Sequence, residues 1–190
     1  MFKLEQKYLA PVAGVDEAGR GPLVGPVVAA AVIIDPTKII DGIQDSKKLP
    51  KAKREFLYDK ITQDYLWSVG IVQHDEIDIM NILEATKKAC MIAVTNLAII
   101  PSTILVDGNM KFKDPRFISI INGDNLSLSI SAASIVAKVT RDRLMFEYSQ
   151  EFPQYMWHKN AGYGTKEHLD AIKLYGISPY HRHSFKVKIL

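Results

Sequence analysis

The sequence has few of the features that mark secreted, membrane-spanning or zinc-binding proteins. Its 190 residues include one cysteine, Cys90, so no internal disulfide can form and a reducing compartment is expected. The longest apolar run, Val24 to Ile34, is too short to span a bilayer. Residues Met1 to Tyr8 alternate charged and apolar side chains and lack a signal-peptide core. We therefore expect a cytoplasmic protein without a membrane anchor.

Neither sign of charge dominates the composition. The 24 Lys and Arg residues slightly exceed the 21 Asp and Glu residues, which gives a formal net charge of +3. This mild basicity permits nucleic-acid binding but does not require it. The five histidines show no ligand spacing such as HxxxH, which argues against zinc. A hydrophobic fraction of 47% and the absence of repeats indicate one globular domain, over residues 1–175, with an irregular C-terminal tail over 176–190 packed on or near it.

Hydrophobic periodicity predicts a mixed α/β layer fold instead of a run of strict βαβ units. Apolar runs predict strands at Val12–Val15, Val27–Ile34, Leu66–Gln73, Thr103–Val106 and Arg116–Ile121. Helical spacing and capping residues predict helices over Lys51–Asp64, from Asn81 to Pro101, over Ser129–Ser149 and over Lys166–Tyr175. Cys90 lies on the apolar stripe of the second helix, so it is interpreted as a packing residue.

The first strand ends in two adjacent carboxylates, Asp16 and Glu17, followed by Gly19-Arg20-Gly21. Adjacent acids repel each other unless their charge is solvated or a cation lies between them. Glycines allow a close backbone approach, and the guanidinium group of Arg20 suits a phosphate. The pattern therefore suggests phosphodiester chemistry.

Two further acids, Asp107 and Asp124, follow the fourth and fifth predicted strands. Each alone is interpreted equally well as a turn residue. Acids at one end of neighbouring strands can also converge, and four oxygen donors favour a hard cation such as Mg²⁺ or Mn²⁺. Gly14 to Gly21 resembles a phosphate-binding P-loop, but Arg20 and Gly21 replace its lysine and hydroxyl residues, so we reject an ATPase.

Other polar residues allow both ordinary and functional interpretations. Lys47 and Lys48, and the basic series Lys138, Arg141 and Arg143, are expected at the surface, with nucleic-acid backbone contacts as the alternative. His158 and His168 are also expected at the surface, with proton transfer as the alternative. Tyr163 lies between two glycines, where an exposed aromatic ring can stack on a sugar or a base. No Gly-x-Ser-x-Gly elbow supports a serine hydrolase.

Taken together, these segments resemble bacterial ribonuclease HII, the type 2 ribonucleases H. The matching segments appear in the family's order and cover the chain from about Val12 to Phe185: Gly14–Pro22, Asp45–Leu49, Val106–Gly108, Gly123-Asp124, Ser131–Asp142, Gly162–Thr165 and His181–Phe185. Arg20 favours type 2 over type 3 enzymes, which typically have Gly-Lys-Gly. Arg182-His183 stands where an Arg-Arg pair is common in the family.

The resemblance implies a ribonuclease H-like α/β fold, with a central mixed five-stranded sheet flanked by helices. It implies an endonuclease that cuts the RNA strand of RNA/DNA hybrids. It also implies cleavage 5′ of single ribonucleotides embedded in duplex DNA, leaving 3′-hydroxyl and 5′-phosphate ends. Asp16, Glu17, Asp107 and Asp124 would then be the catalytic carboxylates of a two-metal Mg²⁺ or Mn²⁺ site, with Asp16 bridging both ions.

The same resemblance implies substrate contacts. Gly19, Arg20 and Gly21 would read the ribose 2′-hydroxyl, the mark that separates RNA from DNA. Tyr163 would stack on the neighbouring sugar, and Lys47 would contact a phosphate. We expect a monomer whose partners are RNA/DNA hybrids and ribonucleotide-containing duplexes. Two alternatives remain open: a DNA nuclease or strand-transfer enzyme on the same fold, and a hybrid-binding module without catalysis.

Overall fold

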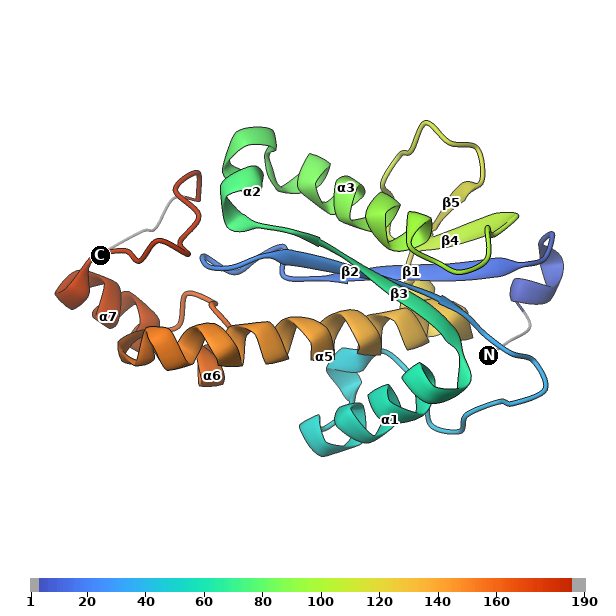
Figure 1. Ribbon diagram of the computed structural model, residues 1–190, viewed down its shortest axis with the longest axis horizontal. Coiled ribbons are helices and arrows are strands. Elements are labelled where there is room, and N and C mark those ends of the chain that lie inside the picture. The colour runs from blue at the N-terminus through green and yellow to red at the C-terminus, as the bar shows by residue number, and fades with distance from the viewer. Residues whose placement is uncertain (1–3, 186–190) are drawn as a thin grey trace.

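The computed structural model describes residues 4–185, which form one central sheet with helices on both faces (Figure 1). The five strands are β1 (Val12–Ala18), β2 (Val27–Ile33), β3 (Leu66–Val72), β4 (Thr103–Asp107) and β5 (Phe117–Ile120). The α-helices are α1 (Lys51–Asp64), α2 (His74–Met80), α3 (Ile82–Thr95), α4 (Gly123–Leu126), α5 (Leu128–Glu151), α6 (Trp157–Asn160) and α7 (Lys166–Tyr175). Three 3₁₀ turns complete them: η1 (Glu5–Lys7), η2 (Ser46–Lys48) and η3 (Pro153–Tyr155).

The sheet is mixed, as predicted. Its strand order is β3-β2-β1-β4-β5, with β1 in the centre. β1 pairs antiparallel with β2 and parallel with β4, while β2–β3 is antiparallel and β4–β5 is parallel. The parallel pairing matters for function because it brings the carboxyl ends of β1 and β4 to the same edge of the sheet.

Each face of the sheet has its own hydrophobic core. Ala29 and Ala31 of β2 belong to the core under α3, whereas Ala30 and Val32 belong to the core under α5 and α1. This alternation confirms that β2 is buried on both faces. Figure 1 shows α2 and α3 on one side of the sheet and α1 and α5 on the other.

The long helix α5 begins in direct contact with the central strand. A Cβ atom at Gly14 would lie 2.1 Å from the backbone carbon of Ser129, so only glycine allows this approach. Ser127 caps the helix by accepting a hydrogen bond from the Ile130 amide. The buried carboxylate of Glu5 accepts from Ser127 Oγ at 2.6 Å and from the Ser129 amide at 2.9 Å. The N-terminus of α5 is therefore fixed under β1.

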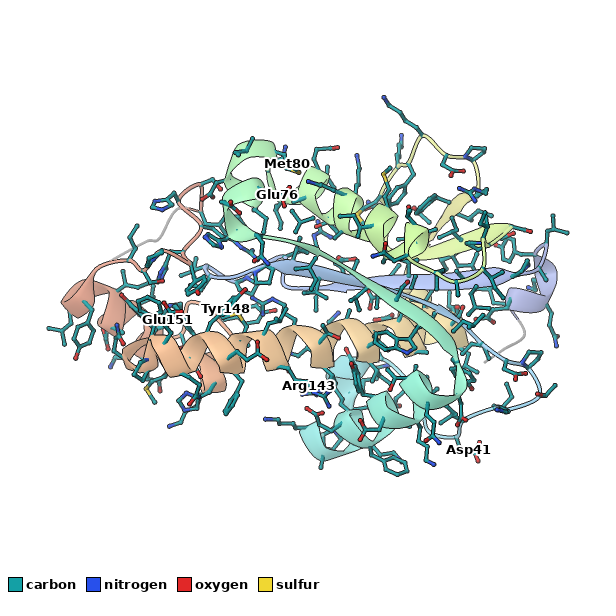
Figure 2. All side chains as sticks on the ribbon, viewed as in Figure 1. Asp41, Glu76, Met80, Arg143, Tyr148 and Glu151 are labelled. Carbon is teal, nitrogen blue, oxygen red and sulfur yellow. The ribbon has the colours of Figure 1, made fainter. Side chains whose placement is uncertain are left out.

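Arg143 joins α5 to α1 on the outer side of this layer, where it lies between the two helices (Figure 2). Its guanidinium group is 2.6 Å from the Glu55 carboxylate and lies over the Tyr58 ring. The side chain is half-exposed, in agreement with its predicted place at the surface.

An aromatic cluster joins the end of α5 to the segments that follow it in the chain. Tyr148 and Glu151 lie near the end of α5 (Figure 2). Tyr148 stacks on Tyr180 of the tail, and the Tyr180 hydroxyl donates to Glu151 at 2.8 Å. His181 pairs with Val24 in an isolated β-bridge. The described part of the tail thus lies against the segment between β1 and β2, while residues 186–190 of the predicted tail lie outside the described range.

The structure corrects several sequence predictions. α2 was not predicted, because His74 to Met80 is short and mostly polar, and it forms as Ile77 packs into the core. Arg141 and His168 were expected at the surface but are buried, at 1% and 0% exposure. Their polar atoms are satisfied by backbone carbonyls and by Trp157, which periodicity cannot reveal. No helix within residues 4–185 is long and apolar enough to cross a membrane.

The Gly14 contact predicts a large stability difference between two glycine substitutions. Gly14→Ala should lower the free energy of unfolding by about 2–3 kcal/mol or more, because strand or helix backbone must move. Gly21→Ala serves as the control, since its Cβ would meet only the Tyr163 ring at 3.5 Å. Urea denaturation of both variants measures the stability difference. Equal denaturation midpoints would contradict the close contact between Gly14 and the start of α5.

A second prediction concerns acid stability. Burial, aided by the neighbouring His168, lowers the pKa of His181 to about 4, and its Nδ1 accepts from the Ser178 amide. Above pH ~6.5 the imidazole is neutral in both states. Between that pH and about 4 only the unfolded chain takes up the proton, so stability is lost as the pH falls.

His181→Asn keeps a hydrogen-bond acceptor near the position of Nδ1. The free energy of unfolding should then fall by about 2–3 kcal/mol less on acidification from pH 7 to pH 4 than it does in the wild type. Unfolding free energies at pH 7 and pH 4 give the measurement, with His158→Asn, at an exposed position of α6, as the control. If the two variants lose stability equally on acidification, His181 is not the group responsible.

Candidate active site

The carboxylates at the end of β1 and β4 lie side by side because of the strand register. Val15 of β1 pairs with Val106 of β4, so the next residues, Asp16 and Asp107, are neighbours on parallel strands. Since side chains alternate along a strand, Asp16 lies on the same face as Gly14, toward α5. Glu17 lies on the opposite face, toward α3.

Asp124 reaches this group from α4, not from the end of β5 as the sequence suggested. Its backbone amide donates to Asp107 Oδ1 at 3.3 Å, and its carbonyl accepts from Ser131 Oγ at 2.7 Å. Asn122 precedes the helix in a left-handed conformation, with φ of 56°. The chain therefore turns back sharply after β5, and the side chain of Asp124, 7% exposed, lies beside Asp107.

Burial and mutual repulsion disfavour the charged form of these acids. Burial, together with the charges of Glu17 and Asp107, raises the pKa of Asp16 well above its usual range. Burial also raises the pKa of Glu17, although Arg20 opposes the shift. The pKa of Asp124 is raised by burial and by Asp107. Acids from β1, β4 and α4 thus share one region of negative charge.

Lys47 is the cation that faces this group. Burial lowers its pKa, but the charges of Asp16, Asp45, Asp124 and Asp107 outweigh burial and raise it. Its position is set by η2, where the Lys47 amide donates to Asp45 Oδ1 at 3.0 Å. Arg54 of α1 in turn donates to the carbonyl of Ser46 at 3.1 Å. Lys47 therefore partly neutralises the carboxylates from a fixed turn.

The carboxylates fit a hard divalent cation by their chemistry. Their donors are oxygens, which Mg²⁺ and Mn²⁺ prefer. Glu17 Oε2 is buried without a hydrogen-bond partner within residues 4–185, so it has a free lone pair for a cation. The described residues contain no group of three or more His, Cys, Asp or Glu side chains already arranged around one point. Side-chain rotation is therefore needed before several of these oxygens can share an ion.

A cavity of about 500 Å³ brings together seven of the nine predicted site residues. Those lining it are Asp16, Glu17, Gly19, Arg20, Gly21, Lys47 and Tyr163. Asp107 and Asp124 do not line the cavity, but the charge of Asp107 acts on Asp16 and Lys47, and that of Asp124 acts on Lys47. The cavity surface therefore combines two acids, the glycine loop, a lysine and a tyrosine from distant parts of the sequence.

Two of the predicted residues that line this cavity, Arg20 and Tyr163, have half-exposed side chains. Arg20 is half-exposed and its Nη1 lies 3.3 Å from Glu17 Oε1. Tyr163 is 47% exposed, and its ring is the nearest group to a Cβ built on Gly21. An exposed ring beside an open glycine loop offers a stacking surface next to the carboxylates.

The backbone at Tyr163 is held by a buried histidine that the sequence did not single out for this role. Trp157 Nε1–H donates to His168 Nε2 at 3.1 Å, so the proton of the neutral imidazole is on Nδ1. His168 Nδ1 then donates to the Tyr163 carbonyl at 2.8 Å. Burial lowers the pKa of His168, which favours this neutral form. The only sequence signal was proximity to Tyr163.

The repulsion among the acids predicts that one neutralising substitution will stabilise the metal-free protein. The raised pKa of Asp16 means that its ionised form opposes folding at pH 7.5. Asp16→Asn should therefore raise the melting temperature by about 2–4 °C without metal. The gain should vanish as the pH falls, because the wild-type carboxyl group then becomes neutral too.

Thermal unfolding in EDTA measures this effect, with Asp41→Asn in the exposed β2–α1 loop as control. Added MgCl₂ should then stabilise the wild-type protein more than Asp16→Asn. An Asp16→Asn protein that melts below the wild type in EDTA at pH 7.5 would contradict the proposed repulsion.

Comparison with known proteins gives a consistent result. The family model for ribonuclease HII matches residues 13–188. Ribonuclease HII of Rickettsia prowazekii (strain Madrid E) is 74% identical over 187 residues, which cover 98% of this chain and 97% of that protein. The crystal structure of ribonuclease H2 from Pyrococcus horikoshii OT3 is 33% identical, with a TM-score of 0.74, and the match covers 92% and 93% of the two chains.

RNase HII from Archaeoglobus fulgidus, solved in a complex with PCNA, has 25% identity and a TM-score of 0.79 over 93% of this chain and 96% of that one. The sequence match therefore spans the sheet, the carboxylates and the described tail. On this evidence the chain belongs to the ribonuclease HII family and is an endoribonuclease.

Proposed function

We propose that this endoribonuclease cuts the RNA strand of RNA/DNA hybrids and also cuts duplex DNA 5′ of a single embedded ribonucleotide. The products would carry 3′-hydroxyl and 5′-phosphate ends. The observation that supports this best is the shared cavity, in which Asp16 and Glu17 lie beside Gly19-Arg20-Gly21 and Tyr163. One substrate can therefore meet the cleaving and the sugar-reading groups together.

Asp16, Glu17, Asp107 and Asp124 are the residues that would hold Mg²⁺ or Mn²⁺. Such ions, when bound, lower the pKa of an attacking water and stabilise the leaving 3′-oxygen. The protein contributes the fixed backbone of β1 and β4, which sets Asp16 and Asp107 side by side. Lys47, which faces these carboxylates and lines the same cavity, would contact a phosphate of the substrate.

Selectivity would come from the Gly19–Gly21 loop and Tyr163. The 2′-hydroxyl is the local difference between RNA and DNA, and backbone groups can read it only at close range. Gly21, where a Cβ would meet only the Tyr163 ring, leaves the loop open to that approach, and the half-exposed Tyr163 ring can stack on the next sugar. The proposal also places the enzyme in the cytoplasm, where its single buried cysteine stays reduced.

The test uses three labelled duplexes: all-DNA, DNA with one ribonucleotide, and an RNA/DNA hybrid. We expect cleavage of the last two in Mg²⁺ or Mn²⁺ and none in EDTA. Asp16→Asn should lower the rate by about 100-fold or more, because it removes a charged metal ligand. Asp41→Asn, at an exposed position that does not line the cavity, is the matched control.

End-group analysis then identifies the cut, since a 3′-hydroxyl can be extended by a polymerase and a 5′-phosphate can be ligated. Asp16→Asn activity within tenfold of the wild type would contradict the role of the carboxylates. Cleavage of the all-DNA duplex would favour a DNA nuclease instead. Binding to the hybrid without any metal-dependent cut would favour a binding module.

A further inference from the structure

Arg182 of the C-terminal tail is buried against the loop that follows β1, where the tail and this loop meet (Figure 1). Its guanidinium group donates to four carbonyls of that loop. Nη2 contacts Gly19 O at 2.6 Å, Nη1 contacts Arg20 O at 3.1 Å and Pro22 O at 2.8 Å, and Nε contacts Gly25 O at 2.9 Å. The side chain thus spans seven residues of loop.

This arrangement is not an ion pair. Within residues 4–185 no carboxylate lies within salt-bridge distance of Arg182, whose guanidinium group contacts carbonyl oxygens and the Phe185 ring. Burial, and then repulsion from Arg141, lower the pKa of Arg182 to about 9, so the group stays charged near neutral pH. Burying a charged group is costly unless its hydrogen bonds are made, and here loop carbonyls make them.

Peptide geometry connects these carbonyls to the cavity. In a planar trans peptide the N–H points opposite to the C=O of the same unit. The Gly19 and Arg20 carbonyls point inward to Arg182, so the N–H groups of Arg20 and Gly21 point away from it. Neither N–H donates to any group within the described range, and both residues line the cavity, whereas Arg182 does not.

A second buried arginine fixes the other side of the same loop. Arg141 of α5 donates to Pro26 O at 3.0 Å and to Val24 O at 3.0 Å. Gly19 has φ of +98°, and a Cβ there would lie 2.1 Å from Arg141 Nε. The loop is therefore held between two guanidinium groups that donate to its backbone. Among the described residues, Arg182 alone donates to the carbonyls of Gly19 and Arg20.

We propose that Arg182 is a positioning residue for ribonucleotide recognition: it turns the Arg20 and Gly21 amides toward the substrate sugar. This inference rests on the proposed function, since it presumes that the loop reads a ribose. Arg182 does not touch the substrate. It determines which side of the Gly19–Pro22 backbone presents donors, and so sets the preference for ribose over deoxyribose.

Arg182→Lys tests this role, because one ammonium group cannot satisfy four carbonyls spread from Gly19 to Gly25. We expect kcat/KM on the single-ribonucleotide duplex to fall by about tenfold or more. Arg116→Lys is the matched control, since Arg116 is a half-exposed arginine paired with Asp114 near β5. Thermal stabilisation by MgCl₂ should be the same in the wild type and Arg182→Lys, because the carboxylates are unchanged.

The decisive readout is binding preference. In an Asp16→Asn background, fluorescence anisotropy gives Kd for the ribonucleotide duplex and for the matched all-DNA duplex. Arg182→Lys should bring the ratio of the two Kd values toward one. A change that only destabilised the fold would weaken both apparent Kd values by the same factor and leave their ratio unchanged. An unchanged ratio would overturn the proposal.

Arg182→Gln is measured in parallel, because an uncharged amide avoids burying an ammonium group. The ratio of the two Kd values is taken from whichever variant keeps the wild-type circular dichroism spectrum. If both variants unfold, Arg182 serves the whole fold and the proposal is wrong. If the wild-type protein itself shows no preference for the ribonucleotide duplex and does not cut it, the proposed function fails first, which separates the two failures.

Discussion

Repulsion among buried carboxylates is the constraint around which this structure is arranged. Asp16 and Asp107 are forced together by the register of β1 and β4, and Asp124 is added by the turn into α4. The fold tolerates this charge because Lys47 faces it and because the sheet edge opens into a cavity. In the proposed function, the same charge that opposes folding would attract a divalent cation.

Rigid support for the neighbouring loops comes from buried cationic and aromatic side chains that donate to backbone carbonyls. Arg141 and Arg182 hold the segment between β1 and β2, and His168 holds the carbonyl of Tyr163. Carbonyls bonded on the inner side leave amides facing outward. A loop built in this way can present backbone donors without having regular secondary structure of its own.

Most of the sheet and the main helices could be predicted from the sequence. The mixed five-stranded sheet, α1, α5 and α7 appear close to their predicted bounds, because β-branched runs, caps and apolar stripes are local signals. α2 was missed because its polar sequence carries no such signal. Arg141 and His168 were assigned to the surface because their type predicts exposure, and only tertiary partners reveal why they are buried.

The sequence by itself determined the chemical types available at the site: acids after strands, a glycine-arginine-glycine turn, and an aromatic ring between glycines. Their order along the chain also carried the family resemblance. Tertiary structure decided which of them meet, because strand register, the turn at Asn122 and the buried arginines act between residues far apart in sequence. Burial and the resulting proximity raise the pKa values of Asp16 and Asp124, and the buried arginines hold the loop carbonyls. Neither effect can be read from local sequence.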